Sequence, residues 1–382
     1  MDPLNTGNSD IIAQIAFFRR QQELAAHDRQ NQVGPSVEAE TCQVPEGSLI
    51  VVDEFVESNL DAKSHGENVE KAARNQGFKG SVFTMSRDRA ARGAQTQELA
   101  QLDLNVFSNP GTSPEEMREG IKTHGKTVAV AVLKTETRTV LNATSSGARN
   151  SVLNISAGKN LAHLTRELYM RVAKGSSPDK RNPPSKSDKV FAENMARAYD
   201  VDLAKLISAD AKLAGPERAK LQEGIARDLS DGVAHQDVAK AQAIFATEVR
   251  RFESNHNSVV IATGNAGQDR QFFKTEAYGK EASFPSGFEA NVLETPEATM
   301  VGATNGAGKR AKIADYNSLA EVDIYANGSL QGQGAGTSFA APRVAAVMAE
   351  LHKRFPDLDS EQIEGKMQEN FADFTNASFI LR

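Results

Sequence analysis

Short apolar runs alternate with longer amphipathic segments along most of this chain. Continuous runs rich in β-branched residues are typical of strands that are buried on both faces of a parallel sheet. Each run is bounded by polar residues or by turn-forming glycine and proline, which favours strands over long buried helices. We therefore predict strands at 48–52, 80–85, 127–133, 151–155, 258–262, 298–303 and 322–325.

Amphipathic segments separate these runs and predict helices. Apolar positions that recur about every 3.6 residues form one face of a helix. Ser113 followed by Glu116 three residues later is the pattern of a capping box, which marks a helix start. Strands that alternate with helices imply an α/β fold with a mostly parallel central sheet flanked by helices. The helices that we expect from this pattern span 10–30, 65–76, 113–123, 338–354 and 359–373.

The stretch from 160 to 255 has a different texture. It is rich in Ala, Lys, Glu, Leu and Arg and contains no strand pattern, so it predicts several successive helices. A Gly-, Ser- and Pro-rich segment at 175–185 interrupts it and predicts a loop.

Composition narrows the class of protein. The chain has 382 residues, one Cys and a formal net charge of −6. A single Cys excludes an internal disulfide framework and a multi-Cys zinc site. The acidic balance argues against a general nucleic-acid binder, and no apolar run reaches the length of a membrane span. The N-terminus lacks the charge order of a secretory signal, so we expect a cytoplasmic protein, with leaderless export left open.

The candidate chemistry centres on Gly334-Ala-Gly-Thr-Ser338-Phe-Ala-Ala-Pro342. A Gly-rich turn leads into an apolar helix and places Ser338 at the helix N-terminus, where free amides favour negative charge. We expect Pro342 to be tolerated because it falls in the first turn. A serine that merely caps a buried helix is the alternative reading of this motif.

The segment from Gly336 to Pro342 resembles the nucleophile motif of the subtilisin-like serine proteases, the subtilases of peptidase family S8. Further segments are similar to the motifs of that family and follow its order along the chain. They are Asp53 after a Val-Val strand, His65-Gly-Glu-Asn-Val69, Val152-Leu-Asn-Ile-Ser-Ala-Gly158, Val259-Val-Ile-Ala-Thr-Gly-Asn265-Ala-Gly267, and the run from Met300 to Ala326.

The resemblance implies a role for four residues. Ser338 corresponds to the nucleophile, His65 to the base that takes its proton, and Asp53 to the carboxylate that orients the imidazole. Asn265 corresponds to the residue whose amide stabilises the oxyanion. Read alone, Asp53 fits a strand-end cap and Asn265 fits a turn residue.

The resemblance also implies where a peptide substrate binds. In the family the substrate adds as a strand beside the cleft segment. Ser156, Ala157 and Gly158 from that segment, with Gly264 from the opposite wall, are the substrate-binding residues that it implies here.

A second histidine competes for the role of base. His124-Gly125 is also followed by a Val-Ala pair, as the family motif requires. We prefer His65, because it follows the Asp53 strand and opens a helical segment. The segment after His124 alternates and is β-branched, which predicts a strand in place of the required helix.

Two intervals depart from the family pattern. The interval from Asp53 to His65 is shorter than usual, and the interval from Gly158 to Asn265 is far longer. The long interval predicts a helical insertion at about 160–235, which would serve as a lid, a substrate-selecting module or a partner site.

Together these observations predict a subtilisin-like three-layer α/β fold with a helical insertion. We expect an N-terminal helical extension at 1–47, a catalytic domain at 48–356, and a C-terminal helix and tail at 357–382. The predicted activity is that of a serine endopeptidase acting on a protein or peptide substrate, with no cofactor, metal, nucleic acid or membrane. The alternative is an inactive subtilase-fold module that binds peptides or partners.

Overall fold

A computed structural model describes residues 43–53, 64–86, 104–156, 160–177, 183–305, 322–330 and 334–370. The chain divides into two units, Met1–Cys42 and Gln43–Arg382. The helix predicted at 10–30 therefore lies outside the described residues. All of the structure below belongs to the second unit.

A six-stranded parallel sheet forms the centre of this unit. Its strand order is β2-β1-β3-β4-β5-β6, and every neighbouring pair is parallel. The strands confirm the predicted runs with one exception, 127–133. A short antiparallel pair, β7 (Ser329–Leu330) and β8 (Gly334–Ala335), precedes the last helices. The six strands are β1 (Leu49–Asp53), β2 (Val82–Ser86), β3 (Val152–Ile155), β4 (Ser258–Ala262), β5 (Thr299–Thr304) and β6 (Ile324–Asn327).

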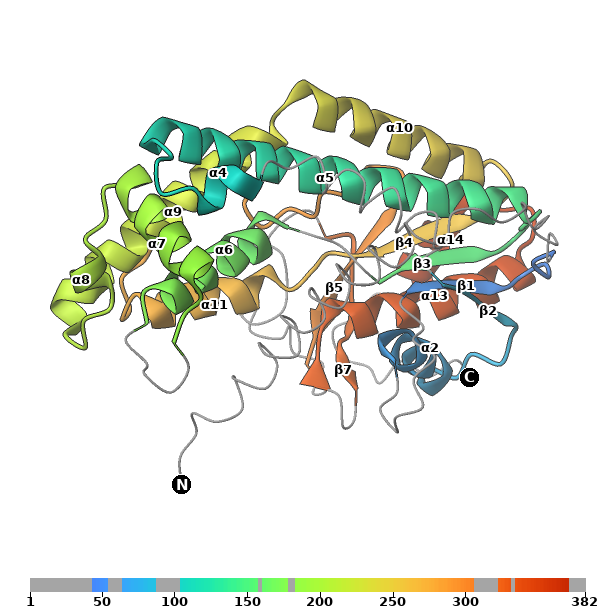
Figure 1. Cartoon of the computed structure of the whole chain (residues 1–382). Helices are drawn as coiled ribbons and strands as arrows, with labels where there is room; N and C mark the ends of the chain where they lie inside the picture. Colours follow the sequence, from blue (N-terminus) through green and yellow to red (C-terminus); the bar gives the residue numbers. More distant parts are fainter. Residues whose placement is uncertain are drawn as a thin grey trace. The chain divides into compact units, whose positions relative to one another are not determined.

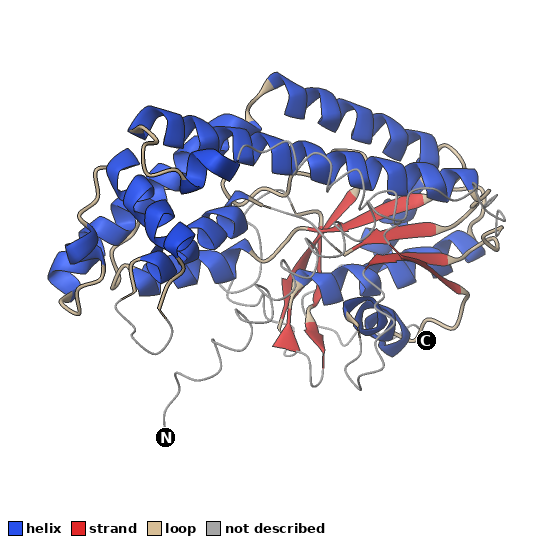
Figure 2. Ribbon diagram, viewed as in Figure 1, coloured by secondary structure: helices blue, strands red, loops and turns tan. Residues whose placement is uncertain are grey.

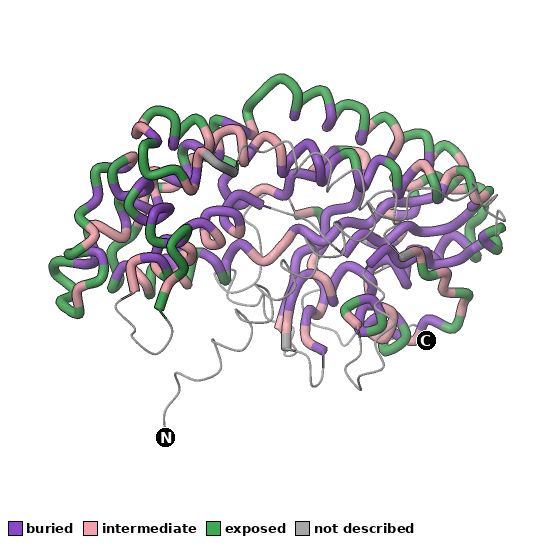
Figure 3. The backbone as a smooth tube through the Cα atoms, in the orientation of Figure 1, coloured by how far each residue is buried: buried purple, intermediate pink, exposed green. Residues whose placement is uncertain are grey.

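Successive side chains of the strands point to opposite faces of the sheet and feed two separate cores. In β1, Ile50 and Val52 join one apolar cluster, whereas Leu49 and Val51 join the other. Both faces are thus covered, which explains why the strands read as continuous apolar runs in place of alternating ones. Figure 3 shows the inner strands buried: β1, β3, β4 and β5 are buried at every residue, whereas β2 and β6 at the edges are partly exposed.

Helices form the outer two layers. α5 (Pro114–Ser145) and α10 (Gln236–Glu253) lie on one face of the sheet. α2 (His65–Asn75), α13 (Thr337–Arg354) and α14 (Ser360–Asn370) cover the other face (Figure 1). This arrangement confirms the predicted three-layer α/β fold.

A group of helices gathers to one side of the sheet (Figure 2). Its members α6 to α9, together with α10, lie between β3 and β4 and confirm the prediction of several helices there. Along the chain, α6 begins five residues after Ser156, and α11 begins directly after Asn265. No helix in the described ranges is both long and apolar enough to cross a membrane. The members are α4 (Leu104–Ser108), α6 (Leu161–Gly175), α7 (Lys186–Ala198), α8 (Leu203–Leu206), α9 (Ala211–Val233) and α11 (Ala266–Glu276).

The prediction of a strand at 127–133 is wrong, because this segment forms the middle of α5. The capping box at its start is as expected: Ser113 Oγ accepts from the Glu116 amide at 3.2 Å. The helix then continues to Ser145 instead of ending near 123. Residues 128–133 are all buried, since α5 lies between the sheet, α9 and α10. A helix that is apolar all round has no amphipathic period, so its sequence resembles a buried strand.

Glycines allow α5 to pass very close to α9. A Cβ at Gly125 would lie 2.8 Å from the carbonyl oxygen of Leu229. A Cβ at Gly232 would come closer still to the carbonyl of Lys122. The His124-Gly125 pair is thus explained by helix packing.

This close approach predicts opposite effects for two Gly→Ala substitutions. Alanine normally stabilises a helix interior by about 0.8–1 kcal/mol relative to glycine. Gly365→Ala in α14 should show that gain, since a Cβ there meets nothing within 4 Å. Gly125→Ala should lose roughly 1–3 kcal/mol because it overpacks the α5–α9 crossing. Urea unfolding of the two variants measures the difference, and a gain in stability for both would contradict the close crossing.

Candidate active site

The site lies where three neighbouring parallel strands end. Asp53 is the last residue of β1, Ser156 follows β3, and Gly264-Asn265 follows β4 by one residue. The carboxyl ends of parallel strands meet at one edge of the sheet, which is the usual place for a ligand in such folds. The remaining two groups, His65 and Ser338, come from the N-termini of α2 and α13, which pack against each other on one face.

Asp53 and His65 form a close pair. His65 Nδ1 lies 2.9 Å from Asp53 Oδ1 and 2.8 Å from Oδ2. Asp53 is only 3% exposed, whereas the His65 side chain is 45% exposed. A buried carboxylate held against one nitrogen leaves the other nitrogen of the ring directed away from it.

A capping box sets the position of His65 on α2. Ser64 is the N-cap: its Oγ accepts from the Glu67 amide at 3.3 Å, while its own amide donates to Glu67 Oε2 at 2.6 Å. Two amides at the helix start are satisfied in this way. His65 is the first residue of the helix, so the cap determines where its side chain begins.

Ser338 meets the opposite nitrogen of the ring. Its Oγ lies 3.2 Å from His65 Nε2. The next residue, Phe339, is buried and packs its ring against the imidazole at a centroid distance of 5.7 Å and a tilt of 33°. Asp53, His65 and Ser338 therefore form one continuous line of hydrogen-bonding groups.

Thr337 holds Asn265 beside this line. The backbone amide of Thr337 donates to Asn265 Oδ1 at 3.0 Å, and its hydroxyl donates to the same oxygen at 3.2 Å. The hydroxyl also accepts from the Gly264 amide at 3.1 Å. With Oδ1 occupied, Nδ2 of Asn265 is the atom left to donate. The amide lies beside Gly336: a Cβ there would lie 3.3 Å from Nδ2, 3.4 Å from Oδ1 and 3.5 Å from Ser338 Oγ.

The cleft segment is described only in part. Ser156 is 6% exposed; its Oγ donates to the carbonyl of Ser338 at 3.2 Å and accepts from Asn154 Nδ2 at 2.8 Å. Ala157 and Gly158 lie outside the described residues. On the other wall, Gly264 has a φ of +99° and adjoins the side chain of Asn160.

Sequence reasoning missed Thr337 and Asn154. Thr337 is adjacent to the predicted nucleophile. Its place at the start of the predicted helix was the available signal that its side chain makes a specific hydrogen bond. Asn154 is a polar residue in an otherwise apolar strand, and that exception was the signal that it carries a specific contact.

The rival histidine lies elsewhere. His124 is in α5, on the face of the sheet opposite to α2 and α13. Its ring packs edge-on against that of Phe107, with the two ring centroids 6.4 Å apart. The geometry brings His65, and not His124, to Ser338. The expectation that a strand follows His124 is wrong, because α5 continues past His124 to Ser145.

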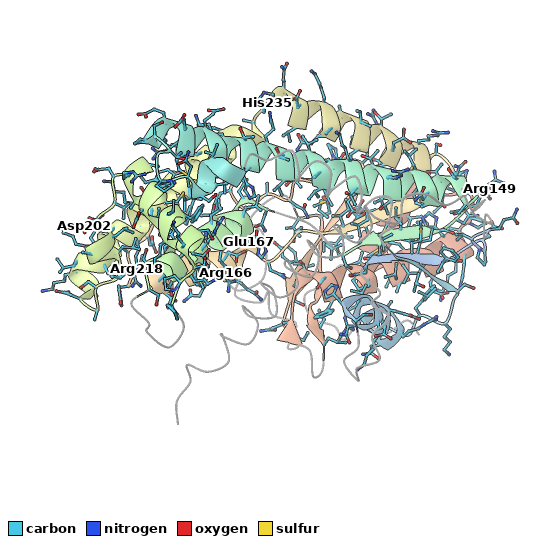
Figure 4. The ribbon with its side chains drawn as sticks, viewed as in Figure 1. Arg149, Arg166, Glu167, Asp202, Arg218 and His235 are labelled. Carbon is cyan, nitrogen blue, oxygen red and sulfur yellow. The ribbon has the colours of Figure 1, made fainter. Side chains whose placement is uncertain are left out.

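Charged side chains join α6 to α11, the helices that follow Ser156 and Asn265 along the chain. Arg166 Nη1 lies 3.1 Å from Asp269, which is buried, and its guanidinium stacks over Phe272 at 4.6 Å. Burial raises the pKa of Asp269, and the neighbouring side chains of His163 and Arg166 oppose that rise. Figure 4 shows Arg166 and Glu167 in the helical group. In the described part of the chain, no group of three or more His, Cys, Asp or Glu residues is placed to hold a metal ion.

Comparison with known families assigns the chain. The model of the subtilase family matches residues 104–379, which is well over half of the chain. The chain therefore belongs to the subtilase family, and the resemblance found in its motifs is confirmed. The matched region includes Asn265 and Ser338 and begins after Asp53 and His65. No curated protein matched the chain, and no solved structure matched it.

The geometry predicts the tautomer of His65. A carboxylate can only accept, so Nδ1 must carry the proton and Nε2 must face Ser338 with its lone pair. Nitrogen chemical shifts of histidine-labelled protein should show the Nδ1–H form. Asp53→Asn should favour the Nε2–H form, because the amide can donate to Nδ1. A wild-type protein already in the Nε2–H form would contradict the arrangement.

Proposed function

We propose that this subtilase-family protein is a serine endopeptidase that cleaves peptide bonds through an acyl-enzyme intermediate. The observation that carries the proposal is the line of hydrogen-bonding groups from Asp53 through His65 to Ser338. A serine hydroxyl is a weak nucleophile and needs an adjacent base, and the base needs a group that orients it. His65 lies within hydrogen-bond reach of both Asp53 and Ser338.

The reaction would use each part in turn. His65 Nε2 takes the proton of Ser338 Oγ as that oxygen attacks the substrate carbonyl, and then delivers the proton to the leaving amine. Water, activated by the same nitrogen, hydrolyses the ester and restores Ser338. Asp53 stays ionised and stabilises the imidazolium.

Asn265 would stabilise the charge that develops on the carbonyl oxygen. A donor contributes most when it is already oriented toward the position of the oxyanion. Thr337 supplies that orientation by donating twice to Oδ1, which leaves Nδ2 on the side of Ser338 and Gly336.

A peptide substrate would add as a strand along the cleft segment, with Ser156, Ala157, Gly158 and Gly264 beside the residue before the cut. Gly264, at a φ of +99°, brings no side chain of its own to that wall. The helices between β3 and β4 begin with α6, shortly after the cleft segment, which supports a role for them in selecting substrates or partners.

Labelling with a fluorophosphonate probe tests the proposal. The wild-type protein should form a covalent adduct, and Ser338→Ala should form none because the attacking oxygen is missing. His65→Ala should label at least about 100-fold more slowly, since general-base catalysis contributes about 10²–10⁴. In-gel fluorescence and mass spectrometry of the adduct measure both rates.

Ser187→Ala is the matched control, since it removes a hydroxyl from the exposed start of α7. It should label like the wild type. An unlabelled wild type that still binds peptides would favour the alternative, an inactive peptide-binding module. Equal labelling of wild type and Ser338→Ala would overturn the assignment of the nucleophile.

Asn265→Asp tests the oxyanion donor separately. The aspartate oxygen can still accept from Thr337, but the donor at Nδ2 is lost. We expect kcat to fall by about 10²–10³ with little change in KM, the range established for such a donor in subtilisin, a member of this family. Steady-state hydrolysis of labelled casein measures the loss. Asn255→Asp, after α10, is the control and should be unchanged; an active Asn265→Asp enzyme would contradict the role.

A further inference from the structure

The backbone of the nucleophile lacks a hydrogen bond that a helix normally provides. α13 begins at Thr337, so Pro342 is its sixth residue and not part of the first turn, contrary to our expectation. Within a helix, the residue four positions later donates its N–H to each carbonyl. For Ser338 that residue is Pro342, which has no N–H.

The hydroxyl of Ser156 takes the place of this missing N–H donor. Ser156 Oγ donates to the Ser338 carbonyl oxygen at 3.2 Å. The two residues are 182 positions apart in sequence, and Ser156 directly follows β3, the neighbour of the strand that ends in Asp53. The contact therefore joins the nucleophile's own backbone to the sheet that carries its partner carboxylate.

Asn154 determines which way this hydroxyl points. Its Nδ2 donates to Ser156 Oγ at 2.8 Å, so the single proton of the hydroxyl is free to be donated to Ser338. Asn154 is fully buried in β3, and among the described residues its Oδ1 has no hydrogen-bond partner. Burial of an unpaired acceptor costs free energy. The stability of the strand alone therefore does not explain an asparagine at this position.

We propose that Ser156 is a positioning residue for the nucleophile, oriented by Asn154. Its hydroxyl replaces the helical N–H that Pro342 removes. The contact holds the first turn of α13 in the place where Ser338 Oγ lies within hydrogen-bond reach of His65. This inference rests on the proposed peptidase function. It also restricts the role of Ser156 in substrate binding to its backbone, because its hydroxyl is already engaged.

A double-mutant cycle in Ser156 and Pro342 tests the inference, with the fluorophosphonate as probe. Misplacement of a reacting group by about 1 Å costs up to about 100-fold in rate. We expect Ser156→Ala to lower the maximal labelling rate by about 10-fold, with the concentration for half-maximal rate unchanged. Pro342→Ala restores an N–H to the helix, so adding Ser156→Ala to it should cost less than about 3-fold.

The outcomes separate the competing roles. A higher half-maximal concentration with an unchanged maximal rate would show that the hydroxyl binds the substrate, and would overturn the proposal. An equal loss in both backgrounds would also overturn it, since the missing helical N–H would then be irrelevant. Labelling at the wild-type rate in Ser156→Ala would do the same while leaving the peptidase function intact.

Two further measurements keep the test decisive. If the wild-type chain is not labelled at all, the proposed function fails, and the positioning role fails with it. If Ser156→Ala does not fold, Asn154→Leu tests the same contact, since it keeps the hydroxyl and removes the group that orients it. We expect about a 3-fold lower maximal rate for this variant, and an unchanged rate would overturn the part assigned to Asn154.

Discussion

The packing of α13 on a parallel sheet is the constraint on which the rest of this structure depends. Parallel strands end at one edge, so residues that follow β1, β3 and β4 are brought together although they are far apart in sequence. α13 is buried along most of its length against these strands and presents its N-terminus at the same edge. A shift of the helix by a fraction of an ångström would separate Ser338 from His65, because their contact already spans 3.2 Å.

Several local features serve this placement at a cost to ordinary helix stability. Gly336 lies where a Cβ would crowd Asn265 and Ser338, and Pro342 removes a hydrogen bond from the turn that carries the nucleophile. Contacts from outside the helix compensate: Ser156 donates to the carbonyl of Ser338, and Thr337 bonds to Asn265 and Gly264. The site is thus held by long-range hydrogen bonds between the ends of strands and the start of one helix.

Local apolar runs predicted all six strands of the sheet, and the family motifs named the residues that now lie together. The prediction failed where burial erased the amphipathic pattern. Residues 127–133 alternate Val and Ala and read as a strand, yet they form the middle of α5, because packing on every side removes the polar face of that helix. The same error entered the argument that His124 is not the catalytic base, which assumed a strand after it. Gly125, next to His124, is required by the close α5–α9 crossing.

By itself, the sequence determined the six strands of the sheet, the subtilase family and the identity of Asp53, His65, Asn265 and Ser338 as the candidates. These depend on local periodicity and on short motifs, which are read directly from neighbouring residues. Only the tertiary structure decided that His65 lies between Asp53 and Ser338 and that Ser156 bonds to the nucleophile's carbonyl. Those contacts join residues up to 273 positions apart, and no local pattern encodes a distance across a folded sheet.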